Sequence, residues 1–294
     1  MGQVDSVQLL QQLVRIPSVN PMGRPVSSEP SAEGPEAGES AGMFSEGRLT
    51  DFLEQFCRRF GLEVFRQPVL PGRENLILRL PGHPPPEQGG QILLWDAHQD
   101  TVPPGQMPNP FDAQLRQGRL YGRGACDVKG GLAAILAALV RLASESVSGQ
   151  SGSASSGTAP ARRPTVYLAA TVDEEHGMSG VRAVQQLWQA GGGEIFPRRP
   201  DAAVVAEPTQ LQVVVAHKGV MRWRCHTRGQ ACHSSQPREG VNAIYLMAEV
   251  LQALQEYAAM VPQLGWHPLC GHPSLSVGRI YGGQSVNIVP DRCT

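Results

Sequence analysis

The sequence predicts an α/β protein in which a mostly parallel, mixed sheet is flanked by helices and followed by a smaller α+β unit. Two short apolar runs, residues 92–95 and 165–172, are continuous rather than alternating, as in strands covered on both faces. Between them, residues 129–143 repeat apolar side chains at i, i+3, i+4 and i+7, the spacing of an amphipathic helix. Strands that alternate with helices favour a parallel α/β sheet.

The N-terminal part of the chain is expected to contain two helices separated by a loop. Residues 4–15 have a helical pattern that Pro17 ends, and residues 47–60 have a second one with Gly61 as C-cap. Residues 20–45 are rich in Pro, Gly, Ser and Glu and show no apolar period. They therefore predict a loop or a partly disordered insertion.

The rest of the first unit alternates between the two kinds of element. We expect further strands at residues 62–65, 75–80 and 201–206 and a helix at residues 181–188. Residues 144–163 are of low complexity, dominated by Ser and Gly, and predict a solvent-exposed linker.

The pattern changes near Val213, and we place a domain boundary there, with a first domain at 1–214 and a second at 215–294. The second domain is expected to contain one helix, at residues 241–254, and several strands. The expected strands are residues 218–227, 274–280 and 285–289, the last two separated by Gly282 and Gly283. One helix with a few strands makes a thin domain.

Composition limits the classes of partner. Hydrophobic residues make up 41% of the chain and charged residues 17%, so a buried core is feasible. The net charge of -1, from 25 basic and 26 acidic residues, argues against nucleic acid or an anionic membrane as partner. We expect no signal peptide and no membrane span. Six cysteines without a CxxC pair indicate reduced thiols and a cytoplasmic protein.

Residues with metal-binding side chains follow the predicted strands or precede the predicted helix. They are His98, Asp100, Asp127, Glu174, Glu175 and Glu207. In open α/β sheets ligands gather outside the carboxyl ends of the strands, so these side chains are expected to meet at one place. Imidazole and carboxylate groups are zinc ligands, and a carboxylate can bridge two metal ions.

Two short motifs carry most of this prediction. In His98-x-Asp100 the carboxylate can accept a hydrogen bond from the second ring nitrogen of the histidine, which would set its tautomer. Glu174 and Glu175 offer a metal ligand and a free base from neighbouring positions. Each motif alone has an ordinary explanation, such as a loop or a solvated helix start, but their joint occurrence at strand ends favours a metal site.

Several stretches resemble a known family in both composition and order. They are Ala97 to Pro103, Gly122 to Gly131, Asp173 to Gly177, Ala206 to Thr209, Gly229 to Ser234, Gly240 to Ile244 and Gly282 to Asn287. Together these stretches resemble the co-catalytic zinc amidohydrolases and peptidases that include acetylornithine deacetylase, succinyl-diaminopimelate desuccinylase, aminoacylase and glutamate carboxypeptidase. The resemblance implies a zinc-exopeptidase-like fold with an α+β lid or dimerisation domain.

The resemblance also implies a role for each site residue. His98 and Glu207 would hold one metal ion, Glu175 the other, and Asp127 would bridge them, with a cis peptide bond to the next residue. Asp100 would orient His98, and Glu174 would be the general base. In the second domain, His233 would stabilise the oxyanion in the site of a partner subunit. Asn287 would help to hold the substrate.

The function implied is that of a metallo-amidohydrolase, or deacylase, of amino-acid metabolism. Its substrate would be a small N-acyl amino acid or peptide, hydrolysed at the amide bond by a water activated by two divalent metal ions. Zinc is the expected metal, with cobalt or manganese as alternatives. The resemblance further implies a homodimer formed through the second domain.

The chain departs from the family pattern at its end. Family members continue beyond the point that matches Thr294 and supply a last histidine ligand, so we expect a C-terminally truncated chain with an incomplete second domain. Two alternatives to the deacylase therefore stay open. One is an inactive fragment or pseudoenzyme that binds metal or a partner, and the other is a dipeptidase or carboxypeptidase of the same family.

Overall fold

A computed structural model describes residues 4–23, 43–151, 162–189 and 193–294. The chain forms two compact units, Met1–Gln210 and Leu211–Thr294. Most of the expected insertion at residues 20–45 and part of the expected linker at 144–163 lie outside the described residues.

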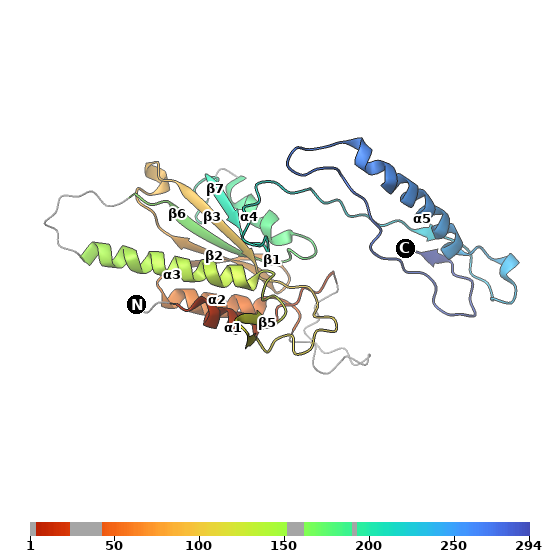
Figure 1. Ribbon diagram of the computed structural model, residues 1–294, viewed down its shortest axis with the longest axis horizontal. Helices are drawn as coiled ribbons and strands as arrows, with labels where there is room; N and C mark the ends of the chain where they lie inside the picture. The colour runs from red at the N-terminus through yellow and green to blue at the C-terminus, as the bar shows by residue number, and fades with distance from the viewer. Residues whose placement is uncertain (1–3, 24–42, 152–161, 190–192) are drawn as a thin grey trace. The chain divides into compact units, whose positions relative to one another are not determined.

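The first unit is built on a mixed, five-stranded sheet with the order β1-β2-β6-β3-β7 (Figure 1). Its strands are β1 (Glu63–Leu70), β2 (Arg73–Leu80), β3 (Ile92–His98), β6 (Thr165–Thr171) and β7 (Ala202–Val205). Strand β2 pairs antiparallel with both β1 and β6, whereas β3 pairs parallel with both β6 and β7. Only β2 therefore runs against the other four, and the expected mostly parallel, mixed sheet is confirmed.

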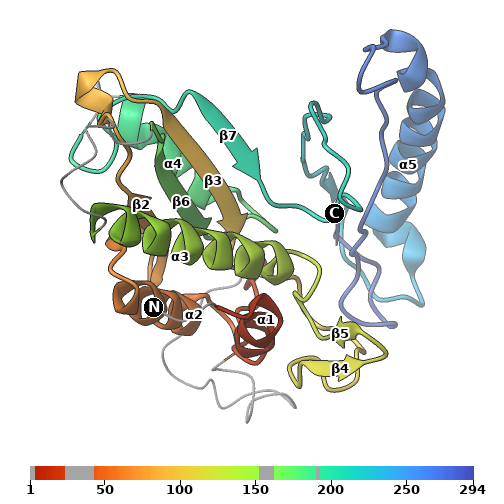
Figure 2. The same ribbon diagram turned by 60° about the vertical axis from the view of Figure 1, so that its left-hand side comes forward.

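Helices cover both faces of this sheet (Figure 2). Helices α1 (Ser6–Val14), α2 (Gly47–Arg59) and α3 (Lys129–Ser151) lie on one face, and α4 (Ser179–Gln189) lies on the other. Alternate residues of a strand point to opposite faces, so Leu168 of β6 packs towards α3 and its neighbour Tyr167 packs towards α4. Both side chains are almost fully buried, which explains the continuous apolar run in the sequence.

Helix α3 is longer than the sequence predicted. The expected linker began at residue 144, but the helix continues to Ser151. Serine has only a modest helix propensity, and a helix that is already formed adds each further residue at small cost. Ser144 supports the extension because its hydroxyl donates a hydrogen bond to the carbonyl oxygen of Val140, one turn earlier, at 2.9 Å. The prediction of a linker over residues 144–151 was therefore wrong.

The start of α3 is anchored to α1 by a buried lysine. Lys129 is fully buried, and its Nζ donates hydrogen bonds to the carbonyl oxygens of Leu13 at 3.0 Å and Ile16 at 2.7 Å. The last carbonyl groups of a helix have no partner within it, and an ammonium group is a favourable one. The loop between β3 and α3 also forms a hairpin that was not predicted, β4 (Gln114–Arg116) with β5 (Arg119–Tyr121).

The second unit has one helix and little regular sheet. Helix α5 (Ala243–Met260) begins after Asn242, whose side-chain oxygen accepts a hydrogen bond from the backbone N–H of Ile244 at 2.9 Å. The two-residue strands β8 (Thr227–Arg228) and β9 (Arg292–Cys293) pair antiparallel. A small core forms where Ala243 and Met247 pack with Cys293.

The strands expected in the second unit were largely wrong. Within the described residues, 218–226 and 274–280 have no strand assignment, and 285–289 contributes only a bridge between Ile288 and His233. A period of two in the sequence shows that a segment is compatible with a sheet, but a strand also needs a partner for its backbone groups. Many apolar side chains are exposed here, among them Val213 at 88% and Met221 at 87%.

Within the described parts of the chain, no helix is long and apolar enough to cross a membrane. All six cysteines are free thiols.

Candidate metal centre

The centre is built around His98, the last residue of β3. Its side chain is 2% exposed. The ring nitrogen Nδ1 lies 2.8 Å from the backbone carbonyl oxygen of Asp100 and 3.6 Å from the carboxylate oxygen Oδ1 of the same residue. The expected partner was the carboxylate, but the closer contact is to the carbonyl. Since a carbonyl oxygen can only accept, Nδ1 carries the proton and Nε2 is the nitrogen available to a ligand.

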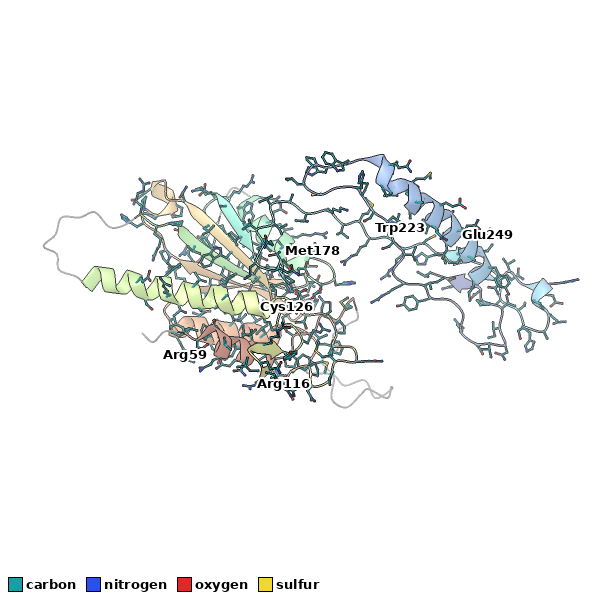
Figure 3. The ribbon with its side chains drawn as sticks, viewed as in Figure 1. Arg59, Arg116, Cys126, Met178, Trp223 and Glu249 are labelled. Carbon is teal, nitrogen blue, oxygen red and sulfur yellow. The ribbon has the colours of Figure 1, made fainter. Side chains whose placement is uncertain are left out.

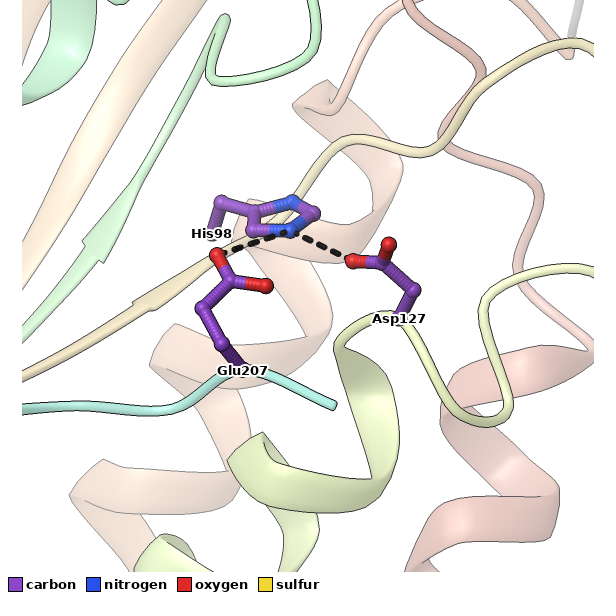
Figure 4. Close-up of side chains that lie close together, drawn as sticks. All are labelled: His98, Asp127 and Glu207. Carbon is purple, nitrogen blue, oxygen red and sulfur yellow. Dashed lines mark hydrogen bonds and ion pairs between the residues drawn. The ribbon is translucent and has the colours of Figure 1, made fainter. Parts of the chain in front are cut away.

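Two carboxylates face this second nitrogen (Figure 4). His98 Nε2 lies 3.0 Å from Asp127 Oδ1 and 3.9 Å from Glu207 Oε1. Asp127 belongs to the loop that enters α3, and its peptide bond to Val128 is cis. Glu207 follows β7. Because β3 and β7 are parallel neighbours, their carboxyl ends lie at the same edge of the sheet, with His98 as the last residue of β3 and Glu207 just after β7.

A second group joins His98 to the turn that follows β6. Candidate ligand atoms of His98, Glu174 and Glu175 lie within 4.8 Å of one another, as do those of His98, Asp127 and Glu207. Among the described residues these are the only two such groups. The structure thus brings together five of the side chains that the strand-end pattern selected.

Asp100, the sixth of these residues, lies directly behind the centre and is fully buried. Its carboxylate oxygens Oδ1 and Oδ2 accept hydrogen bonds from the backbone N–H groups of Glu174 and Glu175, each at 3.1 Å. Burial alone would raise the pKa of Asp100, but the neighbouring His98 imidazole and a hydrogen bond from Asn20 lower it below its usual value. Asp100 is therefore an anion that connects the end of β3 to the turn after β6.

Negative charge accumulates at the centre. Burial disfavours a charged imidazole, yet the neighbouring carboxylates of Asp100 and Asp127 raise the pKa of His98 to about 11. Burial and the charge of Asp127 raise the pKa of Glu175 to about 7. Burial also raises the pKa of Glu207, although the attraction of His98 opposes the shift. Protons are thus held tightly where carboxylates crowd together, which is the electrostatic condition that favours a bound cation.

The donor set fits a divalent metal ion. One imidazole nitrogen and several carboxylate oxygens suit zinc, and they also suit cobalt or manganese. The neighbouring Cys126, labelled in Figure 3, belongs to neither group of candidate ligands, and its side chain is exposed. A metal bound here would replace the proton on His98 and relieve the repulsion among the carboxylates.

The two site residues predicted in the second unit lie on neighbouring segments of that unit. His233 is exposed, and its Nδ1 lies 2.7 Å from the hydroxyl oxygen of Ser235. The carbonyl oxygen of Asn287 accepts a hydrogen bond from the backbone N–H of Ser234 at 3.0 Å, and its Oδ1 accepts one from the Ser285 hydroxyl. The bridge between His233 and Ile288 holds these segments side by side.

Four buried residues next to the centre were not selected from the sequence. They are Asn20, Glu46, Arg73 and Asp173. Asn20 is the first residue of the expected insertion at 20–45, Glu46 directly follows that insertion, and Arg73 falls just before an expected strand. Asp173 is the only one with a local signal, because it directly precedes the Glu174–Glu175 pair.

Comparisons with known proteins show which sequences and folds this chain is similar to. A sequence profile described as "Peptidase dimerisation domain" matches residues 215–294. The chain is 31% identical to an acetylornithine deacetylase of Photorhabdus laumondii subsp. laumondii over 294 residues, which covers 98% of this chain and 65% of the relative. It is 32% identical over 255 residues to the acetylornithine deacetylase of Klebsiella pneumoniae, covering 85% of this chain and 59% of that protein. The chain therefore spans less than two thirds of the length of these relatives.

Solved structures share the fold at lower sequence identity. An M20 family metallo-carboxypeptidase from Sulfolobus solfataricus superposes with a TM-score of 0.61 at 15% identity, covering 99% of this chain and 69% of that one. Human carnosine dipeptidase 1 superposes with a TM-score of 0.58 at 16% identity, covering 98% of this chain and 67% of the dipeptidase.

Proposed function

Because this chain belongs to the M20 peptidase family, we propose that it is the hydrolytic part of a metal-dependent enzyme that cleaves the amide bond of a small N-acyl amino acid. The observation that carries the proposal is the convergence of His98, Asp127 and Glu207 with the Glu174–Glu175 turn at one edge of the sheet. The sequence similarity to acetylornithine deacetylases favours an acyl amino acid as substrate.

Each residue of the centre has a proposed task. His98 and Glu207 would hold one divalent metal ion, Glu175 would hold a second, and Asp127 would contact both. Bound zinc supplies a Lewis acid that lowers the pKa of water and polarises the amide carbonyl. Glu174 would accept the proton of the attacking water on a carboxylate oxygen and then donate it to the leaving amine nitrogen. Asp100 would keep the His98 ring and the Glu174–Glu175 backbone in place.

The experiment for this proposal is a hydrolysis assay on protein reconstituted with zinc, cobalt or manganese. N-acetylornithine, N-succinyl amino acids and dipeptides are compared, and a chelator-treated sample is the control. We expect metal-dependent release of the free amine, fastest with an N-acyl amino acid. A preference for dipeptides would support the peptidase alternative instead. Metal binding without any hydrolysis would support the non-catalytic alternative.

We also propose that the second unit mediates a homodimer and would place His233 and Asn287 beside substrate. Support comes from the family profile over residues 215–294 and from exposed apolar side chains such as Trp266, which is 65% exposed. Sedimentation velocity over a range of protein concentrations tests the assembly. A cytoplasmic location, as proposed from composition, is consistent with the six free thiols.

A further inference from the structure

Asn20 is a buried residue whose side-chain amide makes three hydrogen bonds, all inside the protein. It is fully buried. Its Nδ2 donates one hydrogen bond to Asp100 Oδ2 at 2.7 Å and another to Asp173 Oδ1 at 3.1 Å. Its Oδ1 accepts a hydrogen bond from the backbone N–H of Met22 at 2.7 Å, and its backbone N–H donates to the carbonyl oxygen of Thr101 at 2.8 Å. One amide group thus stands between two buried aspartates.

Both of these aspartates adjoin the Glu174–Glu175 turn. Asp100 accepts the backbone N–H groups of Glu174 and Glu175. Asp173 directly precedes the turn and has a φ of 64°, a left-handed conformation that L-residues seldom adopt without support from their surroundings. The hydroxyl of Ser179 supplies part of that support, donating to Asp173 Oδ2 at 2.6 Å.

Arg73 forms ion pairs with both Asp173 and Glu46. Its Nη1 donates to Asp173 Oδ1 at 3.2 Å, while Nε and Nη2 donate to the two carboxylate oxygens of Glu46 at 2.7 and 2.5 Å. Arg73 is 4% exposed and Asp173 is 3% exposed, so the ion pairs are shielded from water. In the described part of the chain the guanidinium makes hydrogen bonds to Glu46 and Asp173 but none to Asp100, so Asn20 is the side chain that joins Asp100 to this network.

We propose that Asn20 is a positioning residue of the candidate metal centre, one that ties Asp100 to Asp173 and so sets the place of the turn that carries Glu174 and Glu175. The inference rests on the proposed function, because it concerns the placement of the ligand and the base assigned there. Without the amide hydrogens, the Asp100 and Asp173 carboxylates would face each other with no donor between them and would repel. The turn would then shift, and metal ligands tolerate displacements of only about 0.5 Å.

The test is a titration of the metal-free protein with Zn²⁺ and, separately, with Co²⁺, whose visible absorption reports coordination geometry. Asn20→Leu keeps the approximate volume and removes both donors. We expect it to weaken metal binding by about 10- to 100-fold, the range seen when outer partners of metal ligands are lost, and to change the Co²⁺ spectrum. Leu53→Ala is the control, since Leu53 of α2 is buried in the hydrophobic core. It should lower the melting temperature and leave metal affinity within about twofold.

The outcomes separate this inference from the proposed function. If the wild-type protein binds no metal ion, the proposed function is overturned, and the role of Asn20 falls with it. If the wild-type protein binds metal and Asn20→Leu binds it with the same affinity and spectrum, the positioning role alone is overturned. Should Asn20→Leu fail to fold, Asn20→Ser takes its place, because one hydroxyl hydrogen cannot be donated to both aspartates. Unchanged metal affinity in a folded Asn20→Ser protein would likewise overturn the role.

Discussion

Nδ1 of His98 lies 2.8 Å from the carbonyl oxygen of Asp100, two residues further along the chain. Because that oxygen can only accept a hydrogen bond, it sets the tautomer of the ring and turns Nε2 towards Asp127 and Glu207. The backbone at the end of β3 thus makes Nε2 of His98 available to a metal ion. His98 supplies the only nitrogen in either group of candidate metal ligands.

Removing this nitrogen should reduce metal binding. We expect His98→Ala to lose at least one metal ion per chain, because the two groups of candidate ligands share His98 and would keep only oxygen donors. Elemental analysis after dialysis against trace zinc measures the content. His272→Ala, at an exposed histidine of the second unit, is the control. A His98→Ala protein with wild-type metal content would exclude His98 as a ligand.

Glu174→Gln should separate metal binding from turnover. The amide cannot take a proton from water, so we expect kcat to fall by about 10²- to 10⁴-fold, the usual contribution of a general base. Metal content should stay unchanged if Glu175, rather than Glu174, is the ligand. The exposed Glu87 gives a matched control as Glu87→Gln. Turnover near the wild-type rate would rule out Glu174 as the base.

Metal affinity should increase with pH. Imidazole and carboxylate bind a metal ion only after losing their protons, and the pKa values are about 11 for His98 and about 7 for Glu175. Loading both ions at a pH of about 8 should release the proton of His98 in addition to the proton lost by metal-bound water. At a pH of about 6, Glu175 is also protonated, and about one more proton should be released. Calorimetric titrations in buffers of different ionisation enthalpy count the released protons. A metal affinity that does not change between these pH values would contradict the assignment of His98 and Glu175 as metal ligands.

Arg73 should contribute far more to stability than the arginine on the neighbouring strand. Arg73→Met leaves Glu46 buried without its partner, a loss that costs about 3–5 kcal/mol of unfolding free energy. Arg66 also contacts several carboxylates, but its side chain is 31% exposed, so Arg66→Met should cost about 1 kcal/mol or less. Urea unfolding of the metal-free proteins compares them. Equal losses of unfolding free energy in the two variants would show that burial does not increase the contribution of the Arg73 ion pairs.

His233 is expected to act in turnover and not in metal binding. His233→Ala should lower kcat by about 10²- to 10³-fold, as for other donors to an oxyanion, with metal content unchanged. His226 is the control from the same unit, with its Nδ1 2.9 Å from the Thr294 hydroxyl. A similar loss of kcat in His226→Ala would point to a general disturbance of the second unit.

Much of the first unit could be predicted because its signals are local. The period of residues 129–143 predicted α3, and the continuous runs at 92–95 and 165–172 predicted β3 and β6. The end of α3 was missed because helix propensity is a weak signal beside the cooperativity of an existing helix. The strands expected at 218–227 and 274–280 failed for a related reason, since alternation does not reveal whether a partner strand is present.

For the centre, the sequence by itself determined which side chains follow strands that run in parallel, and hence that His98, Glu174, Glu175 and Glu207 would meet. The tertiary structure decided what holds them. Arg73 and Glu46 are 27 residues apart in the chain, and Asn20 and Asp173 are 153 apart. Periodicity reflects how each residue is buried relative to its near neighbours, so it can be read along the chain. Hydrogen-bond partners of buried charges are chosen by proximity in the folded state, which no local pattern encodes.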